Sequence, residues 1–548
     1  ESLSGTINHI STINPIFDKD IMGLDGFTVR NLEIFKSLGN QGTHGTLIDI
    51  VDKTITASGG RMLKQWLNRP LTNKKRLNKR FDIVESFYED SRTLDEIRLC
   101  LKEVSDIERI LGRINNHKVS PKEINGLRFS LEQIPKMKTI FINSTKKPLN
   151  KFSKEFSNIN TVLSEITKVI NKDAPSQIKQ GKVIVDGFDT ELDELRELSK
   201  GGKEWISHLQ ATEREKTGIS SLKVGYNKVF GYFLEITKTH NDKIPEDYIR
   251  KQTLVNAERY ITPELKEYEV KILSADEKIE SIESRIFSKL CQNILRQANL
   301  LQKNAFTLSR CDVLSTFSKV AIDNKYSRPI IKNNQILEIK DGRHPVVEQL
   351  LPQTERFIPN DLYMDINKNQ IHLITGPNMA GKSTYLRQIG VIVLMAQVGS
   401  FVPATKLEFG LVDKLFTRVG ASDNLAGGES TFLVEMNEAA NILNNATKKS
   451  LILLDEIGRG TATYDGLSLA WSITEYLHNT EAIAARTLFA THYHELTDLE
   501  DSLNRVENHH VAVKEFGDKI IFLRQILPGP GDKSYGIHVA KMAGLPTT

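Results

Sequence analysis

The sequence lacks several features that would mark a secreted, membrane-spanning or strongly basic protein. No apolar run approaches the roughly 18 residues of a transmembrane helix. The three cysteines, Cys100, Cys291 and Cys311, are too few and too far apart for a disulfide framework or a zinc ribbon, which fits a reducing cytoplasm. The chain begins with neither a signal sequence nor a methionine, so we expect a processed or excised fragment.

The net charge is also small. The chain has 73 Lys and Arg residues against 69 Asp and Glu residues, a balance of +4 over 548 residues. A protein that bound nucleic acid over its whole surface would be more basic, so any such contact is expected to be local. The length predicts about two to four domains, and neither an internal repeat nor a low-complexity tract is visible.

Hydrophobic patterning divides the chain into four regions. Residues 1–205 have helical periodicity, as in LDEIRLCLKEVSDIERILGRI. Residues 206–262 alternate apolar and polar positions, as in SLKVGYNKVFGYFLEIT, which predicts strands. Residues 263–329 return to helix. Residues 330–548 combine short apolar runs with helices, as in an α/β domain with a largely parallel sheet.

These regions predict a β-rich module carried between two long helices. A plain coiled-coil linker is the alternative interpretation of the helical arm. Within the first region, Gly59-Gly60 and Arg69-Pro70 interrupt the helical pattern and predict turns between helices.

The clearest motif follows an apolar strand predicted at Ile371–Thr375. Residues 376–383, GPNMAGKS, match the phosphate-loop pattern G-x-x-x-x-G-K-[ST], and a helix is expected to start at Ser383-Thr384. Lys382 is predicted to reach the β- and γ-phosphates of a nucleotide, and the Ser383 hydroxyl to ligate Mg²⁺. A chance match is the alternative, but the position between a strand and a helix argues against it. The predicted nucleotide-binding residues of this segment are Gly376, Pro377, Asn378, Met379, Ala380, Gly381, Lys382, Ser383 and Thr384.

An acidic pair follows a second apolar strand at residues 450–454. Asp455 at the strand's end is predicted to hold Mg²⁺ through water, and Glu456 to orient or deprotonate the attacking water. A solvated strand end would explain the pair equally well if it stood alone. Together with the phosphate loop, the pair predicts hydrolysis of ATP to ADP and phosphate.

Two further residues are candidates for the same site. The Gly-rich segment ASDNLAGGESTF leads into a helix and places Ser430 at its start, where an anion could bind. His492 follows the strand TLFAT, at the edge where parallel sheets bind ligands, and could sense the γ-phosphate. A structural histidine is the alternative for His492.

The motifs TGPNMAGKSTYLRQ, GASDNLAGGESTFLVEM, LLDEIGRGTATYDG and FATHYHEL, in this order, resemble the ATPase of the MutS family of mismatch-repair proteins. Upstream, LDGFTVRNLEIF, GGRMLKQWLNRPL, VGYNKVFGYFLEITK and QTLVNAERYITPELKEYE are similar to the family's core, lever and clamp. The resemblance implies a multidomain protein. It would have a helical core and lever at 1–205, a β-rich DNA clamp at 206–262, returning lever helices at 263–329 and an ABC-type P-loop ATPase and dimerisation domain at 330–548.

The resemblance also implies a function. Mg-ATP binding and hydrolysis would open and close a dimeric clamp on double-stranded DNA, mismatched in the full-length protein, and recruit a MutL-type downstream factor. Ser430 would reach the γ-phosphate of the partner subunit, residues 458–460 would face that subunit, and Asn378 would lie near the γ-phosphate. Phe357 and Ile358 would contact the adenine. The location implied is the bacterial cytoplasm, near the nucleoid.

Phosphate contacts of DNA need only a few cations. In the clamp region the basic candidates are Lys228, Lys238, Arg250 and Lys251, and an ordinary solvated surface is nearly as good an explanation for each.

Full-length bacterial relatives begin with a domain that reads the mismatch through a Phe-x-Glu motif. The two such strings here, at Phe87 and Phe233, lie in a predicted helix and a predicted strand, and we interpret both as coincidence. We therefore expect a fragment without that domain. A deletion and a relative that naturally lacks the reader remain alternatives.

Three other classes share part of this pattern. A transporter ATPase would lack the clamp and lever. A chromosome-cohesion ATPase would separate its two ATPase motifs by a long coiled coil, whereas Lys382 and Asp455 lie close in this sequence. A scaffold that binds nucleotide without hydrolysing it would not need Glu456.

Overall fold

The computed structural model describes residues 20–39, 42–227, 231–352, 354–377, 380–419, 431–516 and 519–531. Within these ranges the chain forms two compact units. Unit 1 is built from the described parts of Glu1–Lys102, Lys136–Phe156 and Ala305–Thr548, and unit 2 from Glu103–Pro135 and Ser157–Asn304. No described helix is long and apolar enough to cross a membrane.

Unit 1 contains a seven-stranded sheet with the order β1-β11-β12-β13-β9-β14-β15. Its first six strands run parallel, and β15 pairs antiparallel to β14. The central strands β9, β12 and β13 are buried along their whole length, as expected of a parallel sheet covered on both faces. The strands are β1 (Gly23–Leu24), β9 (Ile371–Thr375), β11 (Lys414–Arg418), β12 (Leu451–Asp455), β13 (Arg486–Ala490), β14 (Val506–Phe516) and β15 (Lys519–Pro528).

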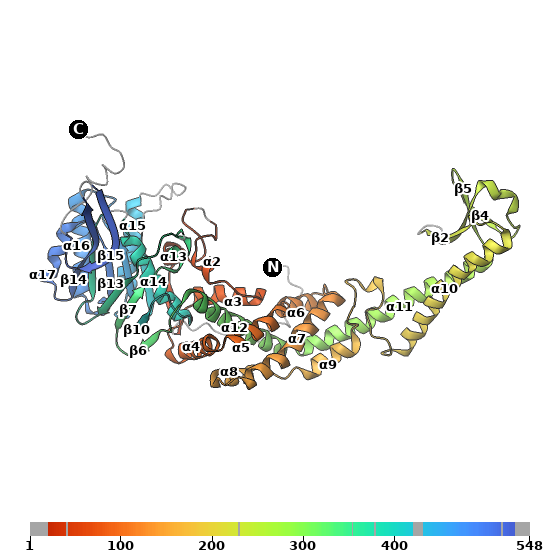
Figure 1. Ribbon diagram of the computed structural model, residues 1–548, viewed down its shortest axis with the longest axis horizontal. Coiled ribbons are helices and arrows are strands. Elements are labelled where there is room, and N and C mark those ends of the chain that lie inside the picture. Colours follow the sequence, from red (N-terminus) through yellow and green to blue (C-terminus); the bar gives the residue numbers. More distant parts are fainter. Residues whose placement is uncertain are drawn as a thin grey trace. The chain divides into compact units, whose positions relative to one another are not determined.

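Helices cover both faces of this sheet (Figure 1). On one face lies α14 (Lys382–Val398), whose Gly390 packs against Leu453 of β12. On the other face, α15 (Thr431–Asn445), α16 (Thr463–Asn479) and α17 (Leu499–Ser502) share one hydrophobic cluster with the strands. Apolar burial on both faces therefore fixes the sheet that carries the phosphate-loop motif.

One edge strand of the sheet, β1, lies near the beginning of the described chain. Gly23 in β1 pairs with Lys414 in β11, and α1 (Gly26–Asn31) follows directly. The Thr28 hydroxyl donates to the Leu415 carbonyl at 3.2 Å, and the Asn31 amide donates to the Thr417 carbonyl at 3.1 Å. These side chains satisfy backbone groups at an edge that would otherwise be unpaired.

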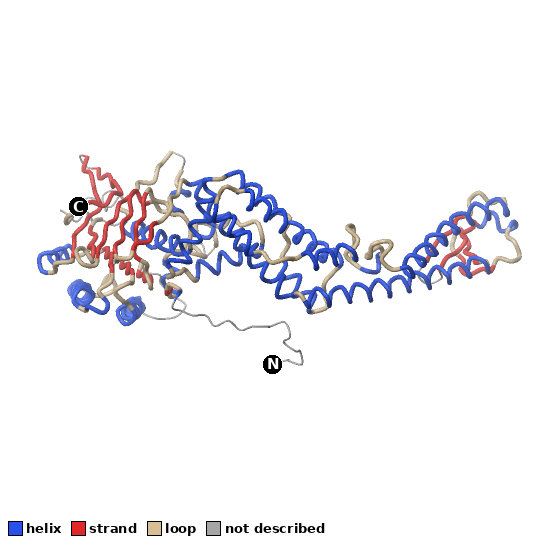
Figure 2. Tube along the Cα trace, turned by 90° about the horizontal axis from the view of Figure 1, so that it is seen from below, coloured by secondary structure: helices blue, strands red, loops and turns tan. Residues whose placement is uncertain are grey.

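A second sheet of unit 1 has the order β6-β10-β7-β8. Its strands are β6 (Ile330–Lys332), β7 (Ile336–Gly342), β8 (Asn360–Asp365) and β10 (Lys406–Gly410), with α13 (Pro345–Leu350) between β7 and β8. Figure 2 shows the strands and the helices of the chain in separate colours.

The Gly59-Gly60 pair does not form a turn, contrary to the expectation from sequence. Both glycines lie in α3 (Ala57–Asn68), whose N-cap is Thr56. Asp312 accepts hydrogen bonds from the Thr56 amide and hydroxyl, both at 2.7 Å, and a Cβ on Gly59 would overlap its carboxylate. Gly59 therefore serves close packing against a buried carboxylate rather than a change of direction.

The remaining helices of unit 1 include α7 and α12, each of which also extends into unit 2. They are α2 (Leu47–Val51), α4 (Lys74–Glu89), α5 (Ser91–Lys102), α7 (Pro121–Asn143), α8 (Lys147–Phe152) and α12 (Ala298–Asn324).

Unit 2 carries a four-stranded antiparallel sheet, order β2-β3-β5-β4, between two long helices. In Figure 1 this sheet lies at the ends of α10 and α11, and one hydrophobic cluster joins the sheet to both helices. Trp205 and Tyr268 stack across the pair with ring centroids 3.6 Å apart. The elements are α6 (Ile107–Asn115), α9 (Asn160–Val169), α10 (Thr190–Thr217), β2 (Lys223–Asn227), β3 (Gly231–Thr237), β4 (Ile249–Thr253), β5 (Ala257–Ile261) and α11 (Pro263–Arg296). Short 3₁₀ helices among the described residues are Ser153–Glu155, Ile178–Gln180, Lys238–Lys243, Glu481–Ile483 and His494–Asp498.

The β-rich region begins later than its sequence suggested. Residues 206–217 continue α10, which ends at Gly218 in the left-handed conformation with φ 63°. Ile206 and Leu209 on this last part of the helix pack under the sheet, so the expectation of strands is wrong for residues 206–217. The division of the chain into four functional domains stays a prediction.

Both phenylalanines of the Phe-x-Glu strings are buried. Phe87 in α4 is fully buried, and Phe233 in β3 lies under the Arg259 guanidinium, whose carbon is 4.2 Å from the ring centroid. Neither side chain can act as an exposed wedge in this structure.

Candidate functional site

Residues 376–381 connect the end of β9 to the start of α14. Gly376 and Gly381 have φ values of 142° and 105°, which side chains with a Cβ rarely adopt. A Cβ on Gly376 would also come within 3.2 Å of Val511. The glycines of the motif are therefore required by the local backbone. Asn378 and Met379 lie outside the described residues, and α14 begins at Lys382, one residue earlier than expected.

The Lys382 side chain is folded into the loop. Its ammonium donates to the carbonyl oxygens of Gly376 at 2.6 Å and Pro377 at 3.2 Å. Burial lowers the pKa of Lys382, against the opposing effect of the negative charges of Glu456 and Asp455. A buried cation held by two neutral carbonyls at a helix N-terminus is suited to exchange those partners for phosphate oxygens.

Asp455 ends β12 at the carboxyl edge of the sheet, close to this loop. Burial raises the pKa of Asp455, while a hydrogen bond from Ser383 lowers it. Its Oδ1 atom is buried and has no hydrogen-bond partner among the described residues. An orphaned carboxylate oxygen beside a hydroxyl is a donor set that fits Mg²⁺, which prefers oxygen ligands and retains bound water.

Glu456 has a left-handed backbone with φ 53°, which is unusual for a residue other than glycine. Its amide donates to the carbonyl of Ala490, the last residue of β13, at 2.9 Å. Its carboxylate accepts a hydrogen bond of 2.6 Å from Arg459. The strained backbone turns the side chain off the strand, so that its charge acts on Lys382 and His492.

His492 follows β13 and lies exposed beside Tyr493, with the two ring centroids 4.1 Å apart. Burial of part of the ring lowers the pKa of His492, and the negative charge of Glu456 opposes this shift. A neutral imidazole is therefore favoured at neutral pH, and it donates a hydrogen bond from one ring nitrogen and accepts one at the other.

A brace fixes the loop after Glu456. The Gly458 amide donates to Glu435 of α15, and its carbonyl accepts a 3.0 Å hydrogen bond from the Tyr493 hydroxyl. Glu435 is in turn paired with Arg418 at the end of β11, at 3.3 Å. The end of β11, the loop after β12 and Tyr493 after β13 are thus linked, partly through α15, a feature that no sequence motif indicated.

A cavity of about 210 Å³ adjoins the phosphate loop. Phe357 and Ile358, expected to contact a base, both line this cavity, together with Gly381 and Thr384 from the start of α14. The other residues of the lining are Val347, Leu351, Asn360, Tyr385, Gln388 and Arg524.

Sequence reasoning did not find Gln388. This side chain is fully buried in α14, and neither its Nε2 nor its Oε1 atom has a hydrogen-bond partner among the described residues. By contrast, Gln397 on the same helix makes three hydrogen bonds to the backbone of Leu71 and Val412. A polar residue within the apolar helix LRQIGVIVLMAQ was the available signal, and only the cavity shows which of the two glutamines is unsatisfied.

The basic candidates of unit 2 differ in their surroundings. Lys238 and Lys251 are exposed, whereas Arg250 forms an ion pair of 3.4 Å with the buried Glu258. Lys228 lies outside the described residues. Arg250 and Lys251 lie in β4, whereas Lys238 begins the 3₁₀ helix Lys238–Lys243, so the described candidates do not form one uniformly positive sheet surface.

Ser430 also lies outside the described residues, and the helix that follows it, α15, begins at Thr431.

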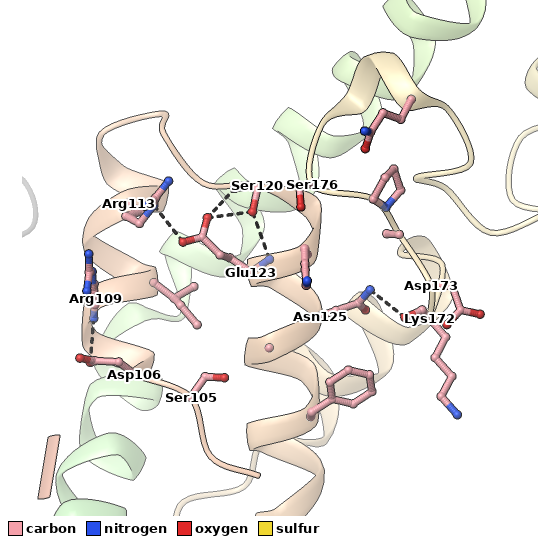
Figure 3. A pocket seen from close by; sticks show the side chains of 17 residues that line it. Ser105, Asp106, Arg109, Arg113, Ser120, Glu123, Asn125, Lys172, Asp173 and Ser176 are labelled. Carbon is pink, nitrogen blue, oxygen red and sulfur yellow. Dashed lines mark hydrogen bonds and ion pairs between the residues drawn. The ribbon is translucent and has the colours of Figure 1, made fainter. Parts of the chain in front are cut away.

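In unit 2 a wide hollow lies beside α6 and α7 (Figure 3). In its lining, Arg113 contacts Glu123 at 3.0 Å, and Glu123 also accepts hydrogen bonds from Ser120. None of the site residues predicted from the motifs lines this hollow, and we therefore place the candidate site at the phosphate loop.

A glycine loop between a parallel strand and a helix, with acidic residues after a nearby strand, is typical of nucleotide-binding α/β proteins. A family model described as MutS domain III matches residues 27–318, and one described as MutS domain V matches residues 372–548. The chain belongs to the MutS family, which confirms the resemblance and a multidomain fold of helical and sheet-containing parts.

Relatives named DNA mismatch repair protein MutS are similar over nearly all of the chain. The protein from Salinibacter ruber is 49% identical over 546 residues, which cover 100% of this chain and 60% of the relative. Those from Parabacteroides distasonis and Acetivibrio thermocellus are each 48% identical, over 98% of this chain and 62% of the relative. The chain thus spans about three-fifths of the length of these curated relatives.

Proposed function

We propose that this chain is a DNA-binding ATPase of mismatch repair, in which Mg-ATP binding and hydrolysis drive a clamp on duplex DNA. The observation that carries the proposal is the convergence of Lys382, Ser383 and the Asp455–Glu456 pair at one edge of the sheet, beside a cavity of about 210 Å³.

The phosphate chain would lie in the loop at residues 376–383. Lys382 would release the carbonyls of Gly376 and Pro377 and donate to the β- and γ-phosphates, while the backbone amides at the start of α14 add positive potential. Asn378 and the remaining loop residues would surround the same phosphates.

Ser383 and Asp455 would hold Mg²⁺, Asp455 through water. The ion supplies charge neutralisation and alignment of the phosphates when bound. Asp455 is suited to this part because its unpartnered oxygen is buried beside Ser383.

Glu456 would orient the attacking water and accept its proton, with His492 near the γ-phosphate. The carboxylate would first leave Arg459, because its lone pairs must face the water. The brace from Gly458 to Tyr493 would keep Glu456 and His492 at a fixed separation.

The cavity beside the loop would take the adenine. Phe357 offers an aromatic face, and the unsatisfied Gln388 amide offers one donor and one acceptor, as does the edge of adenine. We infer that base binding relieves the cost of burying that amide.

The sheet between α10 and α11 would contact the DNA backbone. Lys238, Arg250 and Lys251 are the described cations for this contact, and Lys228 is the fourth. In this scheme the protein acts as a homodimer through its ATPase domain. Ser430 of each subunit would complete the partner's site, residues 458–460 would face the partner, and a MutL-type factor would bind downstream.

The proposal is tested by measuring steady-state ATP hydrolysis of the chain with and without duplex DNA, with light scattering to follow the oligomeric state. We expect ATP hydrolysis that requires Mg²⁺ and whose rate differs with and without duplex DNA. Nucleotide binding without turnover under all these conditions would leave a nucleotide-binding scaffold as the better description.

A further inference from the structure

A cluster of two histidines and a glutamate lies away from the phosphate loop. His372 belongs to β9, and Glu507 and His509 belong to β14. The two strands are parallel neighbours in which Glu507 is the register partner of His372. Because side chains alternate along a strand, Glu507 and His509 point to the same face of the sheet, beside His372.

The potential ligand atoms of the three residues all lie within 4.8 Å of one another. The two imidazole rings are stacked, with centroids 4.3 Å apart and planes 16° apart. The Nε2 atom of His372 is 3.7 Å from a carboxylate oxygen of Glu507, too far for a direct hydrogen bond.

Two ring nitrogens of this cluster are unsatisfied. His372 is 3% exposed, and neither its Nε2 atom nor the buried Nδ1 atom of His509 has a hydrogen-bond partner among the described residues. Burial lowers the pKa of both histidines, while the charge of Glu507 and a hydrogen bond with its backbone oppose the shift at His509. A buried polar atom without a partner is costly, and two of them side by side point to a shared ligand.

The carboxylate of Glu507 has a support of the kind found at metal sites. Asn369 donates from Nδ2 to Glu507 at 3.3 Å and to the carbonyl of Tyr363 at 3.0 Å. Outer hydrogen bonds of this type orient a coordinating carboxylate.

We propose that His372, Glu507 and His509 form a binding site for a divalent transition-metal ion of the Zn²⁺ type. Two imidazole nitrogens and one carboxylate oxygen are a donor set that suits Zn²⁺, with water as a fourth ligand. Small side-chain rotations would bring the three atoms to coordination distance. The ion would link β9, the strand that enters the phosphate loop, to β14.

The site is tested with the whole chain, free of any histidine tag, in buffer with excess Mg²⁺. Zn²⁺ is titrated in competition with a chromophoric chelator, and the visible spectrum is recorded with Co²⁺. We expect one equivalent of Zn²⁺, a tetrahedral Co²⁺ spectrum and a higher melting temperature with Zn²⁺, since the folded chain holds the site.

Three variants locate the ion. His372→Ala, His509→Ala and the shape-conserving Glu507→Gln should each weaken Zn²⁺ binding by at least about tenfold, the lower end of what loss of an outer-shell partner causes. The matched control is His510→Gln, because His510 is the next residue along β14 and its Nδ1 contacts the Gly529 carbonyl at 3.0 Å. It should bind Zn²⁺ like the parent.

Circular dichroism identifies any variant that fails to fold, and Glu507→Gln is then decisive because it changes only a half-exposed side chain. Undiminished Zn²⁺ binding in folded variants, or no uptake by the parent chain, would overturn the proposal. The histidines would then be only a packed, neutral pair.

Discussion

Arg459 holds Glu456 by a hydrogen bond of 2.6 Å between its guanidinium and the glutamate carboxylate. The two residues are three positions apart, and the Arg459 side chain is 63% exposed whereas that of Glu456 is 20% exposed. The exposed guanidinium of Arg459 therefore occupies the carboxylate of the proposed base. A binding partner that attracted Arg459 would release this carboxylate. Residues 458–460 are the segment expected to face a second subunit, so assembly and activation of the carboxylate can be one event.

The first prediction separates chemistry from binding at this carboxylate. Glu456→Gln keeps the shape and an acceptor for Arg459 but cannot take a proton. We expect Mg-ATP to bind as before and hydrolysis to slow by roughly a hundredfold or more, the scale of a positioned base. Single-turnover hydrolysis and a binding titration measure the two effects. Parent-like turnover would mean that another group positions the water.

A second prediction concerns Lys382. Lys382→Ala removes the buried ammonium that would contact the phosphates, so ATP affinity should fall by roughly ten- to a hundredfold, equivalent to about 1.4–2.7 kcal/mol. Lys406→Ala is the control, because Lys406 pairs with Glu338 on the other sheet of unit 1. Equal affinity of both variants for ATP would contradict the phosphate-loop assignment.

The third prediction tests the cavity through the contrast between two glutamines. Gln388→Leu should raise the melting temperature, because it removes two unsatisfied buried atoms, and should lower ATP affinity by roughly tenfold. Affinity for inorganic tripolyphosphate should not change. In the control Gln397→Leu, three backbone hydrogen bonds are lost, so stability should fall instead. Lower stability of Gln388→Leu would show that its amide is satisfied.

A fourth prediction addresses sites shared between subunits. A dimer that pairs Ser430→Ala with Lys382→Ala would combine both defects in one composite site and leave the other intact. We expect ATPase activity well above that of either variant homodimer. A verified mixed dimer that stays inactive would make Ser430 a residue of its own subunit, such as a helix cap.

The fifth prediction is a pH dependence of stability. His344 caps α13, with Nδ1 accepting from the amides of Val346 and Val347, and burial lowers its pKa to about 3. Near pH 5 the unfolded chain binds a proton at this residue and the folded chain does not. The free energy of unfolding should therefore fall by about 2 kcal/mol between pH 7.5 and pH 5 through this residue alone.

His344→Asn gives the corresponding control, since asparagine caps helices without titrating. Chemical denaturation of both proteins at the two pH values should show a smaller acid loss for the variant. Identical losses would mean that the folded chain accommodates a charged His344.

Local sequence signals were enough to predict those elements whose backbone conformation depends on a few neighbouring residues. The strand at Ile371–Thr375, the glycine loop and the acidic strand end could be predicted because apolar runs, glycines and turn positions act over a few residues. The resemblance added Phe357 and Ile358, which line the cavity.

Features that depend on distant partners could not be predicted. Gly59 was expected in a turn, because nothing near it in the sequence reveals that Asp312 packs against it. Residues 206–217 were assigned to strands, although packing under a sheet also suits a helix. The unsatisfied Gln388 and the His372 cluster exist only through contacts between separate elements.

The edge strand β1 has a consequence for the order of synthesis. Thr28 binds the carbonyl of Leu415, a partner 387 residues later in the chain. On the ribosome, this segment must wait for most of the protein before its place in the sheet exists, and such long loop closures slow folding. A recombinant piece starting at residue 330 would contain every proposed ATP ligand and still expose the bare edge of β11, inviting aggregation rather than autonomous folding.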